Sequence, residues 1–555
     1  MRRSAFNYGL APSVKLRRSV FDLSFDHKTT MNAADLVPVF CKEVVPGDTF
    51  SGSATFVART SSPMVRPVMD NFFMDIYFFF VPNRIIDKNW ENMFGYNPNG
   101  PWVPASPVKV PEVYPEITNP SGMKDLFSQS LADYFGDVVP GMTYASAGQL
   151  TSVSQYPYRA YAKIYNDWVV SETTGTPVLV EPTTATLNGR AWAPNNIFGK
   201  PAKIYKTHDR FTSALPAPQR GDPVTIPLTG NAPVVTSETL TNLSGVSLKW
   251  RPTDGTDFRG GAIGGSSSGQ ALYGGSTPTS LGTIEPANLW ADLSDVSAAT
   301  INDLRFAFQM QRILERSAIY GARYTEYIES AFGVKAGDSR LQRAEYLGGS
   351  RNPLSVQQVS QTVEGEGANT LGALGAFSLS SGRARFSKGI VEHGWIIGLA
   401  AIRQFHTYQQ GIPRSHTRFD RFDFYDPSFA HLGYQPIYSY ELFATAPKNQ
   451  IFGYAEAYSD MRRSENMITG ALRSTMENGF DVWHFGDYYK NAPVLNDAFL
   501  QETPLNIDGT LSVRAFNADT GTYTGVPQFL VDFWFDLKAI RPMPVNARPG
   551  LIDHF

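Results

Sequence analysis

The sequence predicts a mainly β protein, and its aromatic, glycine and proline content carries this prediction. Aromatic residues make up 13% of the 555 residues, with 37 Phe, 26 Tyr and 9 Trp, and such side chains favour strands. The 47 Gly and 38 Pro supply frequent turns. Hydrophobic residues account for 42% and charged residues for only 18%, so the chain has enough apolar material for a large core. At roughly 150 residues per domain the length suggests three or four domains, although all-β domains with insertions run longer.

Two strands are expected near the start of the chain. Residues 48–58 alternate between apolar side chains and mostly Thr and Ser, which predicts a half-buried strand. Its apolar face consists of Phe50, Ala54, Phe56 and Ala58. Residues 72–81 are apolar almost without interruption and end at Pro82, which is typical of a strand covered on both faces.

Further strands are expected late in the chain. Residues 392–404 and 436–443 are rich in aromatic and aliphatic side chains. In residues 529–537 apolar side chains alternate with polar ones, and Asp532 and Asp536 lie on the polar face. Strand-like sequence is therefore concentrated before about residue 82 and after about residue 385, so a sheet built from both ends must close around the residues between them.

The middle of the chain predicts loops and a helix. Residues 83–120 are crowded with Pro and aromatics, and residues 216–286 are rich in Gly, Ser, Thr and Pro, which predicts exposed loops. Thr300 and Asp303 resemble a capping box that opens a helix. Apolar residues approximate one face of that helix, namely Ile301, Leu304, Ala307, Phe308 and Leu314.

Charge and cysteine content narrow the class of protein. The net charge is −3, with 48 basic and 51 acidic residues, so the chain is not a globally basic nucleic-acid condenser. Its one cysteine, Cys41, cannot form an internal disulfide. The N-terminus has no apolar core of a secretory signal, and the longest apolar runs are too short to cross a bilayer. We expect a soluble protein made in a reducing compartment.

Residues 1–21 form a basic arm, because the first acidic residue is Asp22. Its cations are Arg2, Arg3, Lys15, Arg17 and Arg18, with Phe6 and Tyr8 among them. Such an arm can bind phosphates by releasing counterions, and the aromatic rings can stack on unpaired bases. Two alternatives stay open: the arm is a solvated tail, or it binds a neighbouring subunit through carboxylates.

The usual catalytic and metal motifs are absent or out of context. Gly265-Ser-Ser267-Ser-Gly269 matches a nucleophile elbow but lacks the flanking strand and helix, and Gly365 to Thr370 lacks the third Gly of a dinucleotide fingerprint. The clustered histidines have no metal-ligand spacing, and they are His393, His406, His416 and His431. The clustered aspartates lack the EF-hand spacing, and they are Asp420, Asp423 and Asp426. We therefore expect no cofactor and no metal site.

A carbohydrate-binding or carbohydrate-cleaving β-sandwich is the alternative function. Aromatic side chains on loops can bind sugars, and a glycosidase needs two facing carboxylates, for which Glu441 and Glu456 are candidates. The same aromatic residues can instead fill a large core and wide subunit interfaces.

Several segments resemble a known family when they are taken together and in order. They include FDLSFDHKTTMNAADLVPVFCKEVVPGDTF (21–50), FFFVPNRI (78–85), NDLRFAFQMQRILERSAIYGARYTEYI (302–328), VEHGWIIGLAAIR (391–403), DVWHFGDY (481–488) and RPMPVNARPGLIDHF (541–555). The chain thereby resembles the major capsid proteins of microviruses, in particular the gokushovirus group of small single-stranded DNA bacteriophages. Residues 215–295 match this family poorly.

The resemblance implies an eight-stranded antiparallel viral jelly roll, a β-sandwich with long inter-strand insertions and a few helices. It also implies a coat protein and not an enzyme. Members of the family form an icosahedral T=1 shell around circular single-stranded DNA. The expected organisation is a basic arm (1–21), core strands from both chain ends (22–82 and 385–555), insertions (83–215 and 296–384), and a surface insertion (216–295) that forms a protrusion at the three-fold axes.

The resemblance also implies partners. They are other copies of the chain, the single-stranded DNA genome, a small basic DNA-binding protein, minor virion proteins and a bacterial surface receptor, without membrane insertion. Assembly is expected in the host bacterial cytoplasm. The basic arm is expected to face the DNA, and Leu272 and Tyr273 in the surface insertion are expected to contact the receptor.

Overall fold

The computed structural model describes residues 17–61, 66–94, 109–113, 129–139, 152–182, 192–222, 301–321, 323–335, 337–360, 374–477, 479–502 and 527–546, residues 64, 224 and 362, and short strands between 234 and 291. The chain forms two compact units. One comprises Met1–Pro218 and Ala318–Phe555, and the other comprises Gln219–Ser317.

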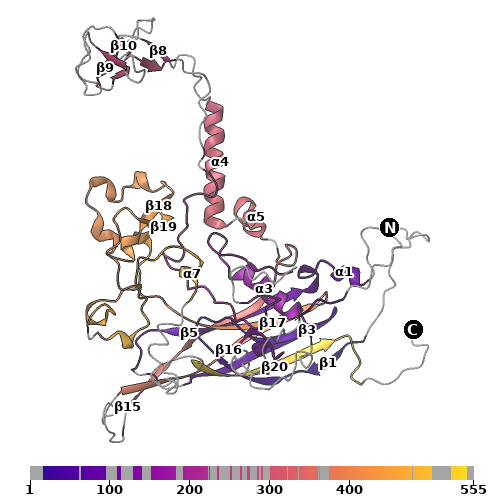
Figure 1. Cartoon of the computed structure of the whole chain (residues 1–555). Coiled ribbons are helices and arrows are strands. Elements are labelled where there is room, and N and C mark those ends of the chain that lie inside the picture. Colours follow the sequence, from indigo (N-terminus) through magenta and orange to yellow (C-terminus); the bar gives the residue numbers. More distant parts are fainter. Residues whose placement is uncertain are drawn as a thin grey trace, which may run out of the picture. The chain divides into compact units, whose positions relative to one another are not determined.

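Two antiparallel sheets lie one over the other in the first unit (Figure 1). The strands of the first sheet follow the order β1 (Ser19–Asp22), β20 (Phe529–Arg541), β4 (Thr49–Thr60), β16 (Leu374–Gly389) and β15 (Val356–Ser360), and β2 (Phe25–Met31) also pairs with β20. The second sheet has the order β14 (Glu345–Leu354), β5 (Phe72–Pro82), β17 (Gly394–Gln404) and β3 (Val37–Val44).

The predicted mainly β class is confirmed. Eight of these strands are divided between the sheets in the orders β2-β20-β4-β16 and β3-β17-β5-β14, which is consistent with a jelly roll. The count of eight is not confirmed, because β1 and β15 extend the first sheet. The sandwich also includes β14, β15 and the start of β16, which lie in residues that we expected to be insertions. Their sequence is rich in Gly and Ser, and they join the sheets through backbone pairing rather than through an apolar pattern.

Alternation of side chains explains both faces of these strands. In β4 the predicted apolar residues Phe50, Ala54 and Phe56 are fully buried in the core between the sheets. In β5 alternate residues such as Ile76 and Phe78 enter the same core, whereas Phe79 and Val81 enter a second core on the other side of the sheet. The prediction that β5 is covered on both faces is therefore confirmed.

Helix α3 (Tyr156–Trp168) covers the outer side of the second sheet next to β17 and β5 (Figure 1). Its Tyr158, Tyr161 and Tyr165 are fully buried in the second core. The Tyr161 hydroxyl donates to the carbonyl of Leu36 at 2.7 Å, so this buried polar group keeps a hydrogen bond.

The remaining elements of the first unit are short. The helices are α1 (Trp90–Met93), α2 (Leu131–Phe135), α5 (Tyr324–Phe332), α6 (Ser459–Arg462), α7 (Asp497–Leu500), η1 (Asn83–Ile85), η4 (Arg414–Thr417), η5 (Arg421–Asp423), η6 (Pro427–Phe429), η7 (Ser439–Glu441), η8 (Gly470–Leu472) and η9 (Asp481–Trp483). The strand pairs are β6 (Glu112–Val113) with β7 (Val153–Ser154), and β18 (Tyr434–Tyr438) with β19 (Ile451–Glu456). The strand predicted over 436–443 is thus shorter, because the chain turns into η7 after Tyr438.

The second unit contains three nested strand pairs. They are β8 (Val234–Thr236) with β13 (Leu289–Ala291), β9 (Trp250–Pro252) with β12 (Ile284–Pro286), and β10 (Ile263–Gly265) with β11 (Leu272–Gly274). The chain therefore runs outward and returns beside itself. The predicted helix is present as α4 (Ile301–Tyr320), and Gly321, with a φ of 94°, separates it from α5.

Candidate functional site

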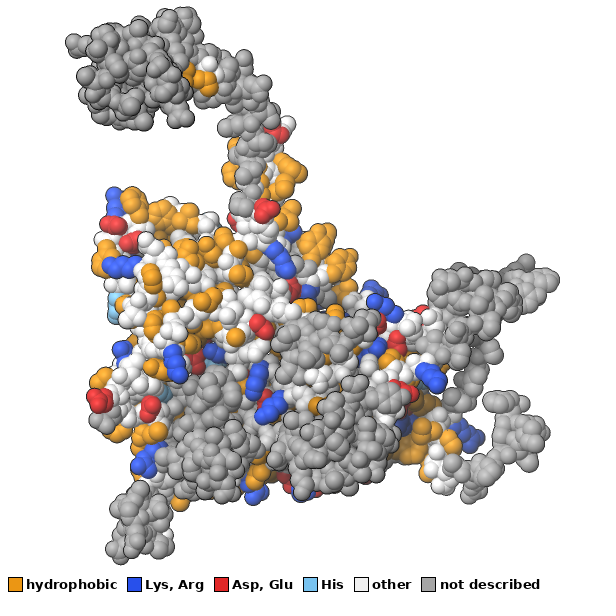
Figure 2. Space-filling model, in the orientation of Figure 1, with side chains coloured by type: hydrophobic (Ala, Val, Ile, Leu, Met, Phe, Trp, Pro, Cys, Tyr) orange, Lys and Arg blue, Asp and Glu red, His pale blue; other side chains and the backbone are white. Residues whose placement is uncertain are grey.

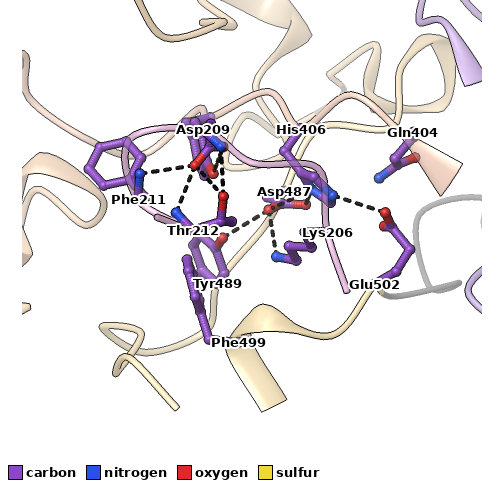
Figure 3. Close-up of polar contacts among 12 residues, drawn as sticks. Lys206, Asp209, Phe211, Thr212, Gln404, His406, Asp487, Tyr489, Phe499 and Glu502 are labelled. Atoms are coloured by element: carbon purple, nitrogen blue, oxygen red, sulfur yellow. Dashed lines mark hydrogen bonds and ion pairs between the residues drawn. The ribbon is translucent and has the colours of Figure 1, made fainter. Parts of the chain in front are cut away.

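A cluster of charged side chains is buried where three segments of the first unit meet (Figure 3). Lys206 Nζ lies 3.1 Å from Asp487 Oδ2. The ring of His406 lies between two carboxylates, with Nδ1 3.1 Å from Asp487 Oδ1 and Nε2 3.1 Å from Glu502 Oε2. Lys206 and His406 thus lie within hydrogen-bonding distance of the carboxylates of Asp487 and Glu502, and all four side chains are buried.

The charges of this cluster stabilise one another. Burial disfavours the charged imidazole, but the carboxylates of Asp487 and Glu502 outweigh that effect and raise the pKa of His406 to about 9. Burial also disfavours the ionised form of Asp487, yet Lys206 and His406 hold its pKa well below the usual range. His406 is therefore protonated at neutral pH and acts as a second cation beside Lys206.

Neighbouring side chains satisfy the rest of this polar cluster. The Tyr489 hydroxyl donates to Asp487 Oδ2 at 2.9 Å, and the Tyr408 hydroxyl donates to Asp209. Asp209 also accepts from the backbone N–H of Thr212 at 2.7 Å. These contacts fasten segments 206–212, 404–408 and 487–502 to each other (Figure 3). The cluster is thus a structural clamp: its groups are engaged and shielded from any substrate.

The carboxylates considered for glycoside cleavage are each bound to arginine. Glu441 is buried, and its Oε2 lies 2.6 Å from Nη2 of Arg210, with Arg414 on its other oxygen at 3.4 Å. Glu456 pairs with Arg462 at 2.5 Å. Neither carboxylate is available as a free acid or base, so this arrangement does not support glycosidase chemistry.

The clustered aspartates cap short helices. Asp420 and Asp423 form a reciprocal capping box around η5. Asp426 accepts from the backbone N–H of Ser428 at the start of η6, at 2.8 Å. Each carboxylate therefore satisfies orphan backbone donors.

The four clustered histidines have separate environments. His393 stacks on Phe94 with 5.6 Å between ring centroids, His406 belongs to the clamp, and His416 and His431 are exposed. Within the part of the chain that the structure describes, no group of three or more His, Cys, Asp or Glu side chains could hold a metal ion.

The predicted nucleic-acid contacts lie mostly outside the described residues. Arg17 and Arg18 are exposed and come directly before β1 at the edge of the first sheet. The other members of the proposed arm site, Arg2, Arg3, Phe6, Tyr8 and Lys15, fall outside the description. The role of the arm in binding DNA stays a prediction.

The predicted receptor residues lie on the innermost strand pair of the second unit. Leu272 pairs with Gly265 and Tyr273 pairs with Gly264 in the β10–β11 ladder. In sequence, β9 and β12 flank this strand pair, and β8 and β13 flank β9 and β12 in turn. This register places both residues close to the turn of the nested ribbon, and their contact with a receptor stays a prediction.

Helix α4 exposes far more apolar surface than a solvated helix does. Of its 20 residues, all of which the structure describes, Ala318 alone is buried. Figure 2 shows hydrophobic side chains along the helix. The exposed large apolar residues are Ile301, Leu304, Phe306, Phe308, Met310, Ile313, Ile319 and Tyr320. Our sequence prediction identified one apolar face of this helix and missed the second, which the four- and three-residue spacing of Phe306, Met310 and Ile313 marks.

A second exposed apolar patch lies on the loops around η5 and η6. Phe419 is 81% exposed and Phe422 is 73% exposed, and Phe424, Tyr425 and Leu432 are exposed nearby. We considered the aspartates of this segment as metal ligands from the sequence, whereas the unusual feature in the structure is the exposure of its aromatic rings. Large exposed apolar patches mark surfaces that bind other molecules.

These features define a class of protein. A β-sandwich holds a cluster of buried charges in internal ion pairs, and apolar side chains are exposed on a helix and on a loop. No helix among the described residues is long and apolar enough to span a membrane. Such a molecule is a structural protein built to associate with further subunits.

Comparisons with known proteins identify the family. Residues 10–551 match the family model described as capsid protein (F protein). The capsid protein VP1 of Spiroplasma virus 4 is 37% identical over 543 residues, which cover 95% of this chain and 94% of that protein. VP1 of Chlamydia phage 1 is 35% identical, covering 97% of this chain and 96% of the relative, and VP1 of Bdellovibrio phage phiMH2K is 35% identical, covering 100% and 99%.

The chain therefore belongs to this family of microvirus capsid proteins, and its relatives fit the gokushovirus group. The predicted resemblance is confirmed. The protein is a structural component of the virion and not an enzyme, which replaces the alternative of a carbohydrate-active β-sandwich.

Proposed function

We propose that this capsid protein assembles into a T=1 icosahedral shell that encloses circular single-stranded DNA. The exposed apolar side chains of α4 and of the 419–432 loops carry this proposal, because obligate subunit interfaces resemble a protein core cut in half. A closed shell is the symmetric arrangement in which such surfaces on every copy find a partner.

Charge arithmetic requires additional cations for DNA packaging. A net charge of −3 per subunit cannot neutralise a genome, however many copies assemble. The compensating charge is therefore local, as in the basic arm with Arg17 and Arg18, or comes from other molecules. The resemblance to the capsid family favours a small basic DNA-binding protein as the source, alongside minor virion proteins, and polyamines or metal ions are the alternative source.

Electron microscopy of particles purified from producing bacteria tests the assembly proposal. We expect uniform closed shells whose nucleic acid resists nuclease before the shell is opened and is degraded by a single-strand-specific nuclease afterwards. Open sheets, filaments or persistent monomers would contradict the T=1 shell. Intact shells that contain only double-stranded DNA or RNA would contradict the proposed cargo while leaving the shell in place.

The second unit is proposed to contact a bacterial surface receptor. Its nested strand pairs carry Leu272 and Tyr273 near the turn, where apolar side chains between Gly-rich segments suit a contact surface. Replacing residues 255–285 with a short Gly-Ser linker is expected to leave shell formation intact and to lower adsorption to host cells at least tenfold. Normal adsorption of the linker variant would remove the receptor role, and the double substitution Leu272→Ser with Tyr273→Ser tests the two residues alone.

A further inference from the structure

A polar hollow lies on the face of the first sheet that points away from the core. Strand β4, in the middle of this face, presents three short hydroxyl side chains in a row there, from Ser51, Ser53 and Thr55. Its neighbours β20 and β16 present long side chains at the same level. Ser53 pairs with Arg385 on one side and with Asp536 on the other, and Thr55 pairs with Arg383 and with Trp534. The short middle row leaves a hollow of ≈ 670 Å³.

The hollow is rich in cations. Among the described residues, Arg383 and Arg385 form no ion pair, and Arg383 donates to the neutral Ser53 hydroxyl at 2.8 Å. Lys538 also forms no ion pair, although it lies opposite Asp22 of β1 and attracts its carboxylate. The nearby carboxylate of Asp532 is already paired with Lys28 at 3.7 Å. Asp536 is the acidic residue that lines the hollow, so the three cations outnumber it there.

An exposed indole lies across β4 from Arg383, on the same face of the sheet. Trp534 is 51% exposed in the middle of β20, although a large core is available on the other face of the strand. Its cross-strand neighbours are Asp26 and Thr55, and Thr55 in turn pairs with Arg383. An aromatic ring kept exposed next to arginines on a sheet is a platform on which unpaired bases stack.

We propose that this hollow binds single-stranded nucleic acid, with phosphates held by Arg383, Arg385 and Lys538 and a base stacked on Trp534. Arg383 and Arg385 lie two residues apart on one face, about 7 Å along the strand, a spacing that suits successive phosphates of an extended single strand. The serine hydroxyls can donate to phosphate oxygens between them. This inference rests on the proposed function, because encapsidated DNA is the ligand, and it is independent of the basic arm.

Binding of a labelled oligothymidylate to the full-length unassembled protein tests the site by fluorescence anisotropy. The double variant Arg383→Gln with Arg385→Gln is expected to bind at least tenfold more weakly. When log affinity is plotted against log salt concentration, the slope is expected to be shallower by roughly 1.4, because two phosphate contacts on a single strand are lost. Trp534→Ala is expected to weaken binding about tenfold, whereas Trp534→Phe keeps most of it.

The matched control is Arg340→Gln with Lys448→Gln, which removes two exposed cations of the same unit away from this sheet. Unchanged far-ultraviolet circular dichroism establishes that each variant is folded. Equal affinity of the control and the Arg383/Arg385 variant for the oligonucleotide would overturn the proposal. Binding of polyglutamate in place of the oligonucleotide would also overturn it and would indicate an acidic protein partner.

If virions contain single-stranded DNA but the hollow variants bind normally, the proposed site in the hollow is wrong and the proposed function stands. If shells carry no DNA, the proposed function itself fails.

Discussion

Replacing Asp487 with Asn is expected to lower the free energy of unfolding of the subunit by about 3 kcal/mol. The carboxylate accepts from Lys206, His406 and Tyr489 inside the clamp. Asn has nearly the same shape but no charge, so Lys206 and His406 would remain buried with one carboxylate, Glu502, nearby. The measurement is the urea midpoint of the unassembled protein.

Exposed Asp481 supplies the matched control for this substitution. It lies at the start of η9, shortly before Asp487 in the sequence, and Asp481→Asn is expected to change stability by less than about 0.5 kcal/mol. Adding Lys206→Met to Asp487→Asn removes the orphaned cation and is expected to restore part of the loss. A urea midpoint for Asp487→Asn equal to that of the Asp481 control would show that the clamp contributes no stability.

The pH dependence of stability reports on the same clamp. Because the pKa of His406 is raised to about 9, its contribution is fully present below its ordinary value of about 6.5 and is lost as the pH rises through about 9. The contribution of Asp487, whose pKa is lowered, is present above about 4 and is lost as the pH falls below that value. The alkaline loss should therefore be smaller in Asp487→Asn than in the parent protein.

The core strands could be predicted because their burial follows a simple period. In β4 and β20 every second residue is apolar, and in β5 almost every residue is, so the sequence indicates which faces are covered. Strands such as β14 carry Gly, Asn and Pro and are held by backbone pairing to β5. Their place in the sheet depends on a partner some 270 residues away, which a local pattern does not contain.

The functional surfaces were harder to predict for the same reason. Lys206, His406 and Asp487 are far apart in sequence, and no motif links them before the loops meet. Arg383 and Trp534 become neighbours only through the central strand β4. By contrast, the family could be predicted, because it depends on many short segments in order and not on the position of any one side chain.

Replacing Phe306, Met310 and Ile313 with Gln is expected to abolish shell formation. These residues lie on one stripe of α4, and Phe306 and Ile313 are 67% and 50% exposed in the single subunit. An apolar stripe with four- and three-residue spacing on an exposed helix is typical of a helix that packs against other helices. Packing around a three-fold axis would bury this stripe on each of the three copies at once. Particle yield, measured by sedimentation and electron microscopy, is expected to fall below detection.

The same variant is expected to keep the stability of the isolated subunit, which separates loss of assembly from loss of folding. Side chains that are exposed before assembly contribute little to subunit folding, so the urea midpoint should stay close to that of the parent. Arg312→Gln, on the same helix but off the stripe, is the control and should assemble normally. Normal shells from the triple Gln variant would show that α4 lies outside the interfaces. The apolar loop around Phe419 and Phe422 would then be the surface on which assembly depends.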